Sequence, residues 1–415
     1  MTAHVAILSG PGIGHLFPSS ELARRLVRHH NVSVTLITQS LGSPSNTERS
    51  LIDSLREDMS VVSIPPPPPD AIPNNKNLIS LLFFLSRYSV PHLRTILNSL
   101  TTTTTTPPLK ALVVDMFFDE ATLDMAHELG VGHYMFFTSP FILLSFALHL
   151  PALDKTYDGE YTDMPEPLKL PGYSQRFRGK DLPQPVLDRK NQVYTDYLNL
   201  AKLYYKTKGI LVNSSEVLEP ELLKALNEDT RIPPVYPVGP LIRSYSSDDV
   251  VSSECLRWLD EQPQGSVLYV SFGSGGTLTG EQMKELAWGL ELSKQRFLWV
   301  VTKPNDHQAS ATYFGGQINT SSFDFLPTGF LDRTKDLVML EEDMKVAVRA
   351  KVDEAGLVRR QEVVRLINCL IDEENGTKMR DRIHQISKAT AVAVEESGLS
   401  FRSMKEVARE WIGLS

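Results

Sequence analysis

Two residues of the sequence, His15 and Asp115, are of types that exchange protons, and both stand where a predicted strand ends. HVAILSG (4–10) comes before the histidine, and ALVVDMFF (111–118) contains the aspartate. Such short apolar runs are typical of strands buried on both faces of a parallel sheet. A carboxylate beside an imidazole orients the ring and stabilises its protonated form. The two residues are therefore a candidate general base with its partner, if the fold brings them together.

The first 240 residues alternate strand-like and helix-like segments, which predicts a doubly wound parallel sheet. The first four predicted strands are 4–10, 32–38, 60–64 and 111–118. In such a sheet the strand order reverses beside the first strand, and the fourth strand lies across the reversal. We therefore expect His15 and Asp115 to face each other at this switch point. Each residue alone is explained as a helix cap or turn residue, but their shared placement favours a functional pair.

A glycine-rich turn, GPGIGH (10–15), joins the first predicted strand to a helix predicted from Ser19. Turns at this place in an α/β unit bind phosphate groups. The spacing is GxGxG, and the second strand ends in Thr38 and Gln39, neither of which is acidic. A nicotinamide cofactor is therefore disfavoured, because its fingerprint needs GxGxxG and a later acidic residue. Of the possible functions, a nicotinamide oxidoreductase therefore agrees least well with the sequence.

A second glycine-rich turn, SFGSGGT (271–277), follows a predicted strand in the C-terminal half. Its backbone can approach a phosphate group, to which Ser274 can donate, and a plain strand-to-helix turn explains it equally well. The predicted helix 279–295 begins with Thr279 and Gln282 at the spacing of a capping box. Two halves of this kind suit a nucleotide-linked substrate held by one half and an acceptor held by the other.

Composition excludes several classes of protein. Lys and Arg number 42 against 50 Asp and Glu, a net charge of −8, which disfavours a nucleic-acid partner. Cys255 and Cys369 are too few for a disulfide framework and suit a reducing compartment. The N-terminus reads as a strand, and the apolar stretch 134–153 contains serine, proline and histidine. We expect a cytoplasmic protein without stable membrane insertion.

Changes in composition along the chain predict its domains. A segment rich in Ser, Asp and Pro, 235–253, marks the boundary between two α/β regions. The predicted domains are 1–240, a linker 241–253, a C-terminal domain 254–398 and a final helix 399–415. This last helix is expected to pack back on the N-terminal domain.

The C-terminal domain has too few predicted strands. After 266–274 and 296–304 the strands stop, 305–337 looks irregular, and 338–415 reads as helical. A two-stranded sheet is only marginally stable. The sequence therefore indicates either an unusual C-terminal half or the loss of a block near Leu337–Val338.

Six segments, spread over almost the whole chain, resemble the plant family 1 UDP-glycosyltransferases. They are HVAILSGPGIGHLFP (4–18), VVDMFFDEA (113–121), GILVNSSEVLEPELLKAL (209–226), VYPVGPL (235–241), CLRWLDEQPQGSVLYVSFGSGGTL (255–278) and LPTGFLDRT (326–334). SFGSGGTLT (271–279) and LEEDMKVAV (340–348) are similar to the hydroquinone glucosyltransferase group, which glucosylates small phenols. The resemblance implies the α/β GT-B fold, with two Rossmann-like domains facing a cleft.

The resemblance also implies a reaction and its residues. The residue matching His15 is the general base of the family, and the one matching Asp115 is its partner. The base removes the proton of an acceptor hydroxyl, the oxygen attacks the anomeric carbon of UDP-glucose with inversion, and UDP leaves. Acceptor contacts fall on Met116, Phe117 and Phe84, and donor contacts on Gly14, Ser274 and Gly275. UDP-glucose is a co-substrate; no metal or other cofactor is expected, and the chain is expected to be a monomer.

The chain departs from the family pattern at one place. TKDL (334–337) runs directly into VMLEEDMKVAV (338–348), and no H-C-G-W-N-S run occurs. Family members carry a long signature box between these segments, which binds uracil, ribose, phosphates and sugar. We hypothesise that the chain is a splice form, gene-model product or deletion variant, inactive or nearly so, whose N-terminal domain still folds. The alternative function is a non-catalytic remnant that binds phenols or a protein partner.

Overall fold

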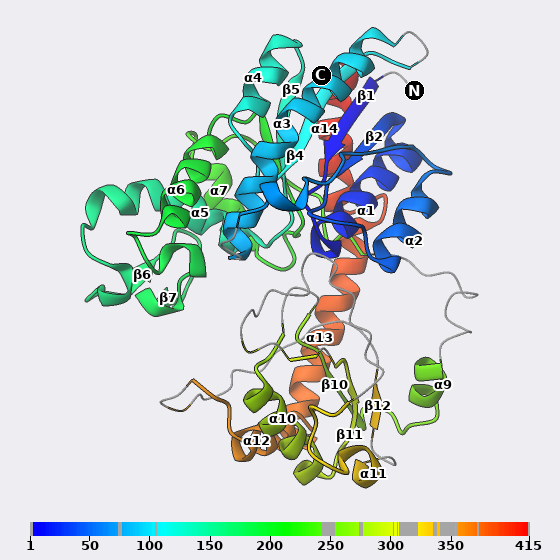
Figure 1. Cartoon of the computed structure of the whole chain (residues 1–415), viewed down its shortest axis with the longest axis vertical. Coiled ribbons are helices and arrows are strands. Elements are labelled where there is room, and N and C mark those ends of the chain that lie inside the picture. The colour runs from blue at the N-terminus through cyan, green and yellow to red at the C-terminus, as the bar shows by residue number, and fades with distance from the viewer. Residues whose placement is uncertain are drawn as a thin grey trace. The chain divides into compact units, whose positions relative to one another are not determined.

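The computed structural model divides the chain into two compact units, Met1–Ile242 with Ile386–Ser415, and Arg243–Gln385 (Figure 1). The structure describes residues 3–73, 77–103, 106–242, 254–273, 277–301, 303–304, 306, 323–334, 338–340, 353, 356–371 and 373–413. No helix in these ranges has the length and apolar character that a membrane crossing needs.

A seven-stranded sheet, in the order β3-β2-β1-β4-β5-β8-β9, forms the centre of the first unit. Its strands are β1 Ala3–Leu8, β2 Val32–Thr38, β3 Ser60–Ser63, β4 Leu109–Asp115, β5 Gly132–Phe137, β8 Gly209–Val212 and β9 Val235–Pro237. All neighbouring strands are parallel. The order reverses beside β1, with β2 on one side and β4 on the other, so the predicted doubly wound sheet is confirmed.

The helices of the first unit lie between these strands in the sequence, except α14, which follows all of them. They are α1 Ile13–His30, α2 Asn46–Leu55, α3 Leu78–Thr102, α4 Ala121–Glu128, α5 Phe141–Thr156, α6 Gln192–Tyr204, α7 Pro220–Glu228 and α14 Leu399–Ile412. The smaller elements are the antiparallel pair β6 Leu168–Lys169 and β7 Arg176–Phe177, and the 3-10 turns Pro69–Ala71, Tyr161–Asp163, Gly179–Asp181 and Gln184–Val186.

The C-terminal helix α14 completes the core of the first unit, and its red ribbon lies among that unit's elements in Figure 1. It packs against β9, α1 and β4. Val407 is fully buried, and the ring of Trp411 meets Tyr134 edge-on, with 5.4 Å between the ring centroids. Aromatic rings favour this edge-to-face arrangement over a face-to-face sandwich. Residues far apart in sequence therefore share one hydrophobic core.

Helix α1 begins earlier than the sequence predicts, and this places His15 inside a helix. The prediction put the start at Ser19, after Pro18, whereas the helix starts at Ile13. Gly12 turns the chain at φ 80°, and its carbonyl accepts hydrogen bonds from the N–H groups of His15 and Leu16. Pro18 lies inside this helix, in its second turn.

The second unit contains a three-stranded parallel sheet in the order β10-β11-β12 within the described residues. Its strands are β10 Val267–Val270, β11 Arg296–Trp299 and β12 Val338–Leu340, and its helices are α9 Glu254–Asp260, α10 Gly280–Ser293, α11 Phe330–Thr334 and α12 Arg360–Ile371. Helix α13, Glu373–Val394, runs on from these residues into those of the first unit.

Strand β12 corrects the prediction that strands stop after 296–304 and that 338–415 is helical. Val338 and Leu340 pair with Phe297 and Trp299 of β11. Alternation cannot be recognised over three residues, so only pairing with a neighbouring strand identifies this segment. Helix α11 likewise lies within a stretch that the sequence analysis treats as irregular. Around this sheet, Trp299 and Phe330 are fully buried and meet edge-on at 6.2 Å.

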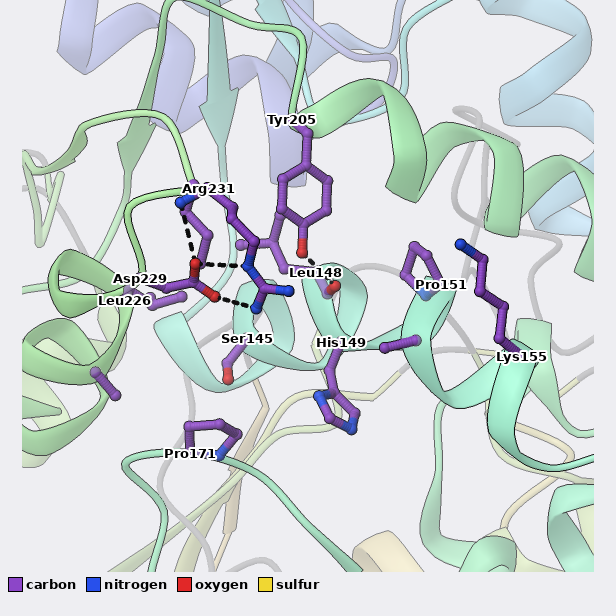
Figure 2. Close-up of a pocket in the computed structure, with 13 residues that line it drawn as sticks. Ser145, Leu148, His149, Pro151, Lys155, Pro171, Tyr205, Leu226, Asp229 and Arg231 are labelled. Carbon is purple, nitrogen blue, oxygen red and sulfur yellow. Dashed lines mark hydrogen bonds and ion pairs between the residues drawn. The ribbon is translucent and has the colours of Figure 1, made fainter.

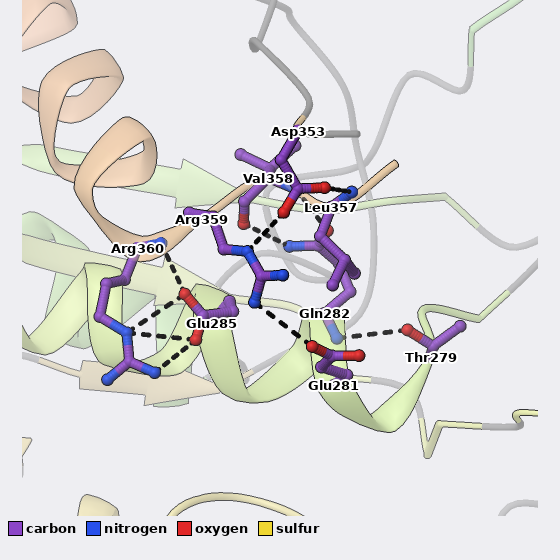
Figure 3. Close-up of polar contacts among 9 residues, drawn as sticks. All are labelled: Thr279, Glu281, Gln282, Glu285, Asp353, Leu357, Val358, Arg359 and Arg360. Atoms are coloured by element: carbon purple, nitrogen blue, oxygen red, sulfur yellow. Dashed lines mark hydrogen bonds and ion pairs between the residues drawn. The ribbon is translucent and has the colours of Figure 1, made fainter. Parts of the chain in front are cut away.

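Helix α10 is tied to the segment before α12 by polar contacts (Figure 3). Thr279 caps the helix, because its hydroxyl accepts a hydrogen bond from the N–H of Gln282 at 3.2 Å. The side chain of Gln282 does not close the predicted capping box. It bonds instead to the backbone of Val358, donating at 2.9 Å and accepting at 2.8 Å. The cap is therefore present, and the glutamine serves a longer-range contact.

Replacing Glu285 with alanine is expected to lower the free energy of unfolding of the second unit by about 1–3 kcal/mol. This buried carboxylate accepts bonds from the backbone N–H and the guanidinium of Arg360, so its loss leaves these donors without their partner (Figure 3). The matched control is Glu281→Ala on the same helix, where one exposed contact to Arg359 is lost. Its effect should stay within about 0.5 kcal/mol. Urea unfolding measures both, and equal effects would contradict this account.

Candidate active site

The structure brings His15 and Asp115 together at the switch point of the first sheet. His15 lies in the first turn of α1, directly after β1, and Asp115 is the last residue of β4. Because β1 and β4 are neighbours, Nδ1 of His15 reaches Oδ2 of Asp115 at 2.6 Å. One hundred residues separate the two in sequence, and the pairing of β1 with β4 in the sheet brings them together.

The carboxylate of Asp115 is buried and fixed from several sides. Its exposed fraction is 1%. The N–H of Phe117 donates to Oδ1 at 3.1 Å, while Oδ2 faces His15. Gly10 leaves room for the carboxylate, since a Cβ there would lie 2.7 Å from Cγ and Oδ1 of Asp115. The position of Asp115 therefore depends on Gly10, in the glycine-rich turn between β1 and α1.

Asp115 governs the protonation of His15. Burial lowers the pKa of His15, but the charge of Asp115 and the hydrogen bond to it raise this pKa by more, so the pKa lies above its ordinary value of 6.5. A carboxylate accepts hydrogen bonds, so the neutral imidazole places its proton on Nδ1 and its lone pair on Nε2. Nε2 is then the atom that accepts a proton.

Two residues near His15 are not found by the sequence analysis. The hydroxyl of Thr138 lies 3.4 Å from Nδ1 of His15 and 3.6 Å from Sδ of Met116. It directly follows β5, the strand next to β4, so a search for polar residues at the carboxyl ends of strands could have found it. The ring of Phe83 meets the ring of Phe117 edge-on at 5.8 Å, and only tertiary packing reveals this contact.

The predicted acceptor residues lie at different distances from this pair. The ring of Phe117 is 6.2 Å from the imidazole of His15. Met116 is buried, and its carbonyl accepts a hydrogen bond from the hydroxyl of Tyr204 at 3.0 Å. Phe84 stacks on Tyr88 at 6.2 Å, so Phe83, and not Phe84, provides the ring beside Phe117.

The predicted donor residues are only partly within the described structure. Gly14 is exposed in the first turn of α1, next to His15. Ser274 and Gly275 lie outside the described residues. In the ranges that the structure describes, no group of three or more His, Cys, Asp and Glu side chains is placed to hold a metal ion.

An apolar cavity of about 230 Å³ lies beside the first turns of α5. It is lined by Ile142, Leu143, Phe146, Leu170, Phe177, Asp181, Leu182 and Pro183. Helix α5 begins at Phe141, three residues after Thr138. Consecutive Cα atoms are about 3.8 Å apart, so Ile142 lies within about 15 Å of Thr138. The lining of this cavity comes from α5 and from the segment that contains β6 and β7, and it does not include His15 or Asp115.

Glu219 fixes the beginning of α5. Its carboxylate accepts hydrogen bonds from the N–H groups of Phe141 and Ile142, each at 2.9 Å, and from the hydroxyl of Ser214 at 2.6 Å. The first N–H groups of a helix have no partner within it, and Pro140 at the N-cap supplies no side-chain acceptor. Glu219 replaces the missing cap and holds the wall of the cavity in place.

Gly10→Ala is expected to separate Asp115 from His15. The new Cβ would overlap the carboxylate, which is buried and cannot move without breaking its hydrogen bonds. We expect a loss of about 1–3 kcal/mol in the free energy of unfolding and a lower pKa of His15. Gly42→Ala is the matched control, because no atom lies within 4 Å of its Cβ position. Thermal unfolding and an NMR titration of His15 test this, and a Gly10→Ala protein with an unchanged pKa would contradict it.

The comparisons with known proteins agree on one family. No family model matches the chain. The hydroquinone glucosyltransferase of Rauvolfia serpentina is 38% identical to it, over 99% of this chain and 98% of that protein. The UDP-glycosyltransferase 72B1 of Arabidopsis thaliana is also 38% identical, over 99% of this chain and 96% of that protein.

Solved structures give the same result for the fold. UGT2 of Phytolacca americana, complexed with UDP-2fluoro-glucose and pterostilbene, is 34% identical over 99% of this chain and all of that one, with a TM-score of 0.86. A UDP-glucosyltransferase from Polygonum tinctorium, capable of glucosylating indoxyl, is 32% identical over 99% of both chains, with a TM-score of 0.88. Because these proteins match in sequence and fold over nearly their full length, the chain belongs to the plant UDP-glycosyltransferases and has their α/β GT-B fold.

Proposed function

We propose that the first unit performs the acceptor half of glucose transfer from UDP-glucose to a small phenol, with His15 as general base. The contact of 2.6 Å between His15 and Asp115 carries this proposal. Nε2 of His15 takes the hydroxyl proton, and the phenolic oxygen attacks the anomeric carbon. The bond between that carbon and UDP breaks at the same time. The attack comes from the face opposite UDP, so the configuration inverts. Asp115 stabilises the imidazolium that forms.

A phenol fits this site better than an alkyl alcohol. A phenol ionises near pH 10, as tyrosine does, so a base with a raised pKa can deprotonate it as the oxygen attacks. Apolar side chains surround the site and suit a ring. We propose that Met116, Phe117 and Phe84 contact the acceptor, together with Phe83, which touches Phe117. Two relatives support a phenol as the class of acceptor: one is a hydroquinone glucosyltransferase, and the other is complexed with pterostilbene.

The donor side is proposed on resemblance. UDP-glucose is the proposed co-substrate, with Gly14, Ser274 and Gly275 as donor contacts and without a metal or other cofactor. A solved relative is complexed with UDP-2fluoro-glucose, which supports this class of donor. We further propose a monomer in the cytoplasm, in line with the small number of cysteines.

A second candidate function is phenol binding without transfer, and the second unit favours it. The alignment with the Rauvolfia serpentina protein extends over 465 positions, whereas the chain has 415 residues, so at least 50 positions have no residue of this chain. The described sheet of the second unit has three strands. Both observations support the loss of a block between Leu337 and Val338, where the resemblance places the donor-binding signature.

One experiment separates the two functions. The full chain is incubated with UDP-glucose and hydroquinone, and the glucoside is sought by mass spectrometry, while calorimetry measures the binding of each compound alone. Glucoside that disappears in His15→Ala establishes the transferase. Hydroquinone binding without UDP-glucose binding and without glucoside establishes the second function. A chain that neither binds hydroquinone nor forms glucoside contradicts both.

A further inference from the structure

A second, larger cavity of about 390 Å³ lies in the first unit beside α5, α7 and the segment after α7 (Figure 2). Pockets that hold small molecules begin near this volume. Its apolar walls include Leu148, Ala152 and Leu226, and its polar groups come from Ser145, His149, Lys155, Tyr205, Asp229 and Arg231. None of these residues takes part in the proposed transfer reaction.

The larger cavity is separate from the apolar cavity of about 230 Å³ beside the first turns of α5. Ser145, Leu148 and Ala152 of α5 line the larger cavity, and Ile142, Leu143 and Phe146 line the smaller one. Successive residues of an α-helix are rotated by roughly 100°, so these two sets lie more than a quarter turn apart. Helix α5 therefore carries one cavity on each of two faces, and a ligand in one leaves the other open.

An ion pair between Asp229 and Arg231 lines the larger cavity, and the Arg231 side chain is 78% exposed. Asp229 accepts hydrogen bonds from Nε of Arg231 at 2.8 Å, from its terminal nitrogen at 2.6 Å and from its backbone N–H at 3.0 Å. Figure 2 shows this pair beside Ser145 and below Tyr205, whose hydroxyl donates to the carbonyl of Leu148 at 2.7 Å. A guanidinium has five N–H donors, and the side-chain bonds to Asp229 use two of them. The remaining donors are not used by Asp229 and can meet an anion at the mouth of the cavity.

The charges that line the cavity leave a positive excess. The negative charge of Asp229 balances the positive charge of Arg231, and the positive charge of Lys155 remains. Lys155 lies exposed in the last turn of α5. Burial, and then the charge of Arg231, lower the pKa of His149, so its imidazole is neutral at neutral pH. The site thus combines apolar walls with guanidinium donors and one net positive charge.

We propose that this cavity binds a small amphipathic anion, an aryl carboxylate. The ring lies against Leu148 and Leu226, the carboxylate accepts hydrogen bonds from the outward N–H groups of Arg231, and Lys155 adds its charge at the rim. An aryl carboxylate matches all three features, whereas a neutral phenol leaves the charge unmatched and acetate leaves the apolar walls uncovered.

Calorimetric titration of the full chain with benzoate tests this proposal. We expect a Kd on the order of 1 mM, a normal value for a ligand of this size. Benzamide has the same ring without the charge and should bind at least fivefold more weakly. Ala152→Trp places an indole in the cavity and should abolish binding, and Lys155→Gln should weaken it about two- to fivefold. The NMR signals of the His149 imidazole should shift with benzoate, which provides a readout in the unaltered chain.

His15→Ala is the control that separates this site from the active site. It should bind benzoate as the unaltered chain does, and hydroquinone should not compete. Neither measurement needs UDP-glucose or turnover, so a failure here is distinct from a failure of the proposed transferase. The proposal is overturned if benzoate neither binds nor shifts His149, if benzamide binds equally well, or if Ala152→Trp still binds.

Discussion

Insertion of the proposed missing block between Leu337 and Val338 should raise the rate of hydroquinone glucoside formation at least about a hundredfold. The segment is taken from the Rauvolfia serpentina relative, whose alignment covers 99% of the present chain. A hydrogen bond to a charged group contributes about 1.5–3 kcal/mol. Two such bonds to the donor phosphates already correspond to about a hundredfold in rate or affinity.

The second unit should also unfold at a higher temperature after the insertion. Strand β10 stands at the edge of the described sheet, and Tyr269 in this strand and Phe272 just after it are 39% and 50% exposed. In a complete doubly wound sheet the first strand is central, so additional strands would cover this surface. Each Å² of apolar surface that these strands cover stabilises the folded unit by about 25 cal/mol, so its unfolding temperature should rise.

The control for this prediction is a glycine-serine segment of the same length, inserted at the same place. It reproduces the change in chain length but provides neither strands nor donor contacts, so it should restore neither activity nor stability. Glucoside formation is measured by mass spectrometry at matched protein concentration. If the chain with the family segment performs no better than the chain with the linker, the donor site is not what the present chain lacks.

His15→Ala, made in the chain that carries the inserted segment, should lower the rate of transfer to hydroquinone by about 10²–10⁴-fold. Without the imidazole the phenol must lose its proton to water as the oxygen attacks. The loss should shrink as the acceptor becomes more acidic, and should almost vanish for a phenol that is already ionised in neutral buffer. This dependence distinguishes a general base from a residue that only shapes the site.

His29→Ala provides the matched control, because His29 is an exposed histidine in the last turn of the same helix. It should leave the rate unchanged with every acceptor. The measurement is kcat/KM over a series of phenols of decreasing pKa. A His15→Ala enzyme whose loss is the same for acidic and weakly acidic phenols would exclude proton abstraction by His15.

The pairing of His15 with Asp115 was predictable because long-range order in a parallel sheet follows from local signals. Every residue of β1 is buried, and so is nearly every residue of β4, so both strands appear in the sequence as continuous apolar runs. The βαβ alternation then determines which strand lies across the switch point. A contact between residues one hundred positions apart thus needs no information beyond the order of strands and helices.

Other features depend on packing that a local pattern does not contain. The contact between Phe83 and Phe117 depends on how α3 packs against the segment after β4, and neighbouring Phe84 has the same local pattern. Strand β12 exists only through its pairing with β11. The early start of α1 depends on the positive φ of Gly12. The predicted donor residues Ser274 and Gly275 fall outside the described residues, so the structure does not test them.

An NMR titration of the His15 imidazole, in the unaltered chain and in Asp115→Asn, tests the central claim most directly. The claim is that Asp115 stabilises the imidazolium, and it holds whether or not the chain transfers glucose. We predict a pKa above the ordinary 6.5 in the unaltered chain, where the charge of Asp115 outweighs burial. In Asp115→Asn the carboxylate charge is gone and burial remains, so the pKa should fall below that of the unaltered chain. A pKa at or below 6.5 in the unaltered chain, or one that Asp115→Asn leaves unchanged, would contradict the account.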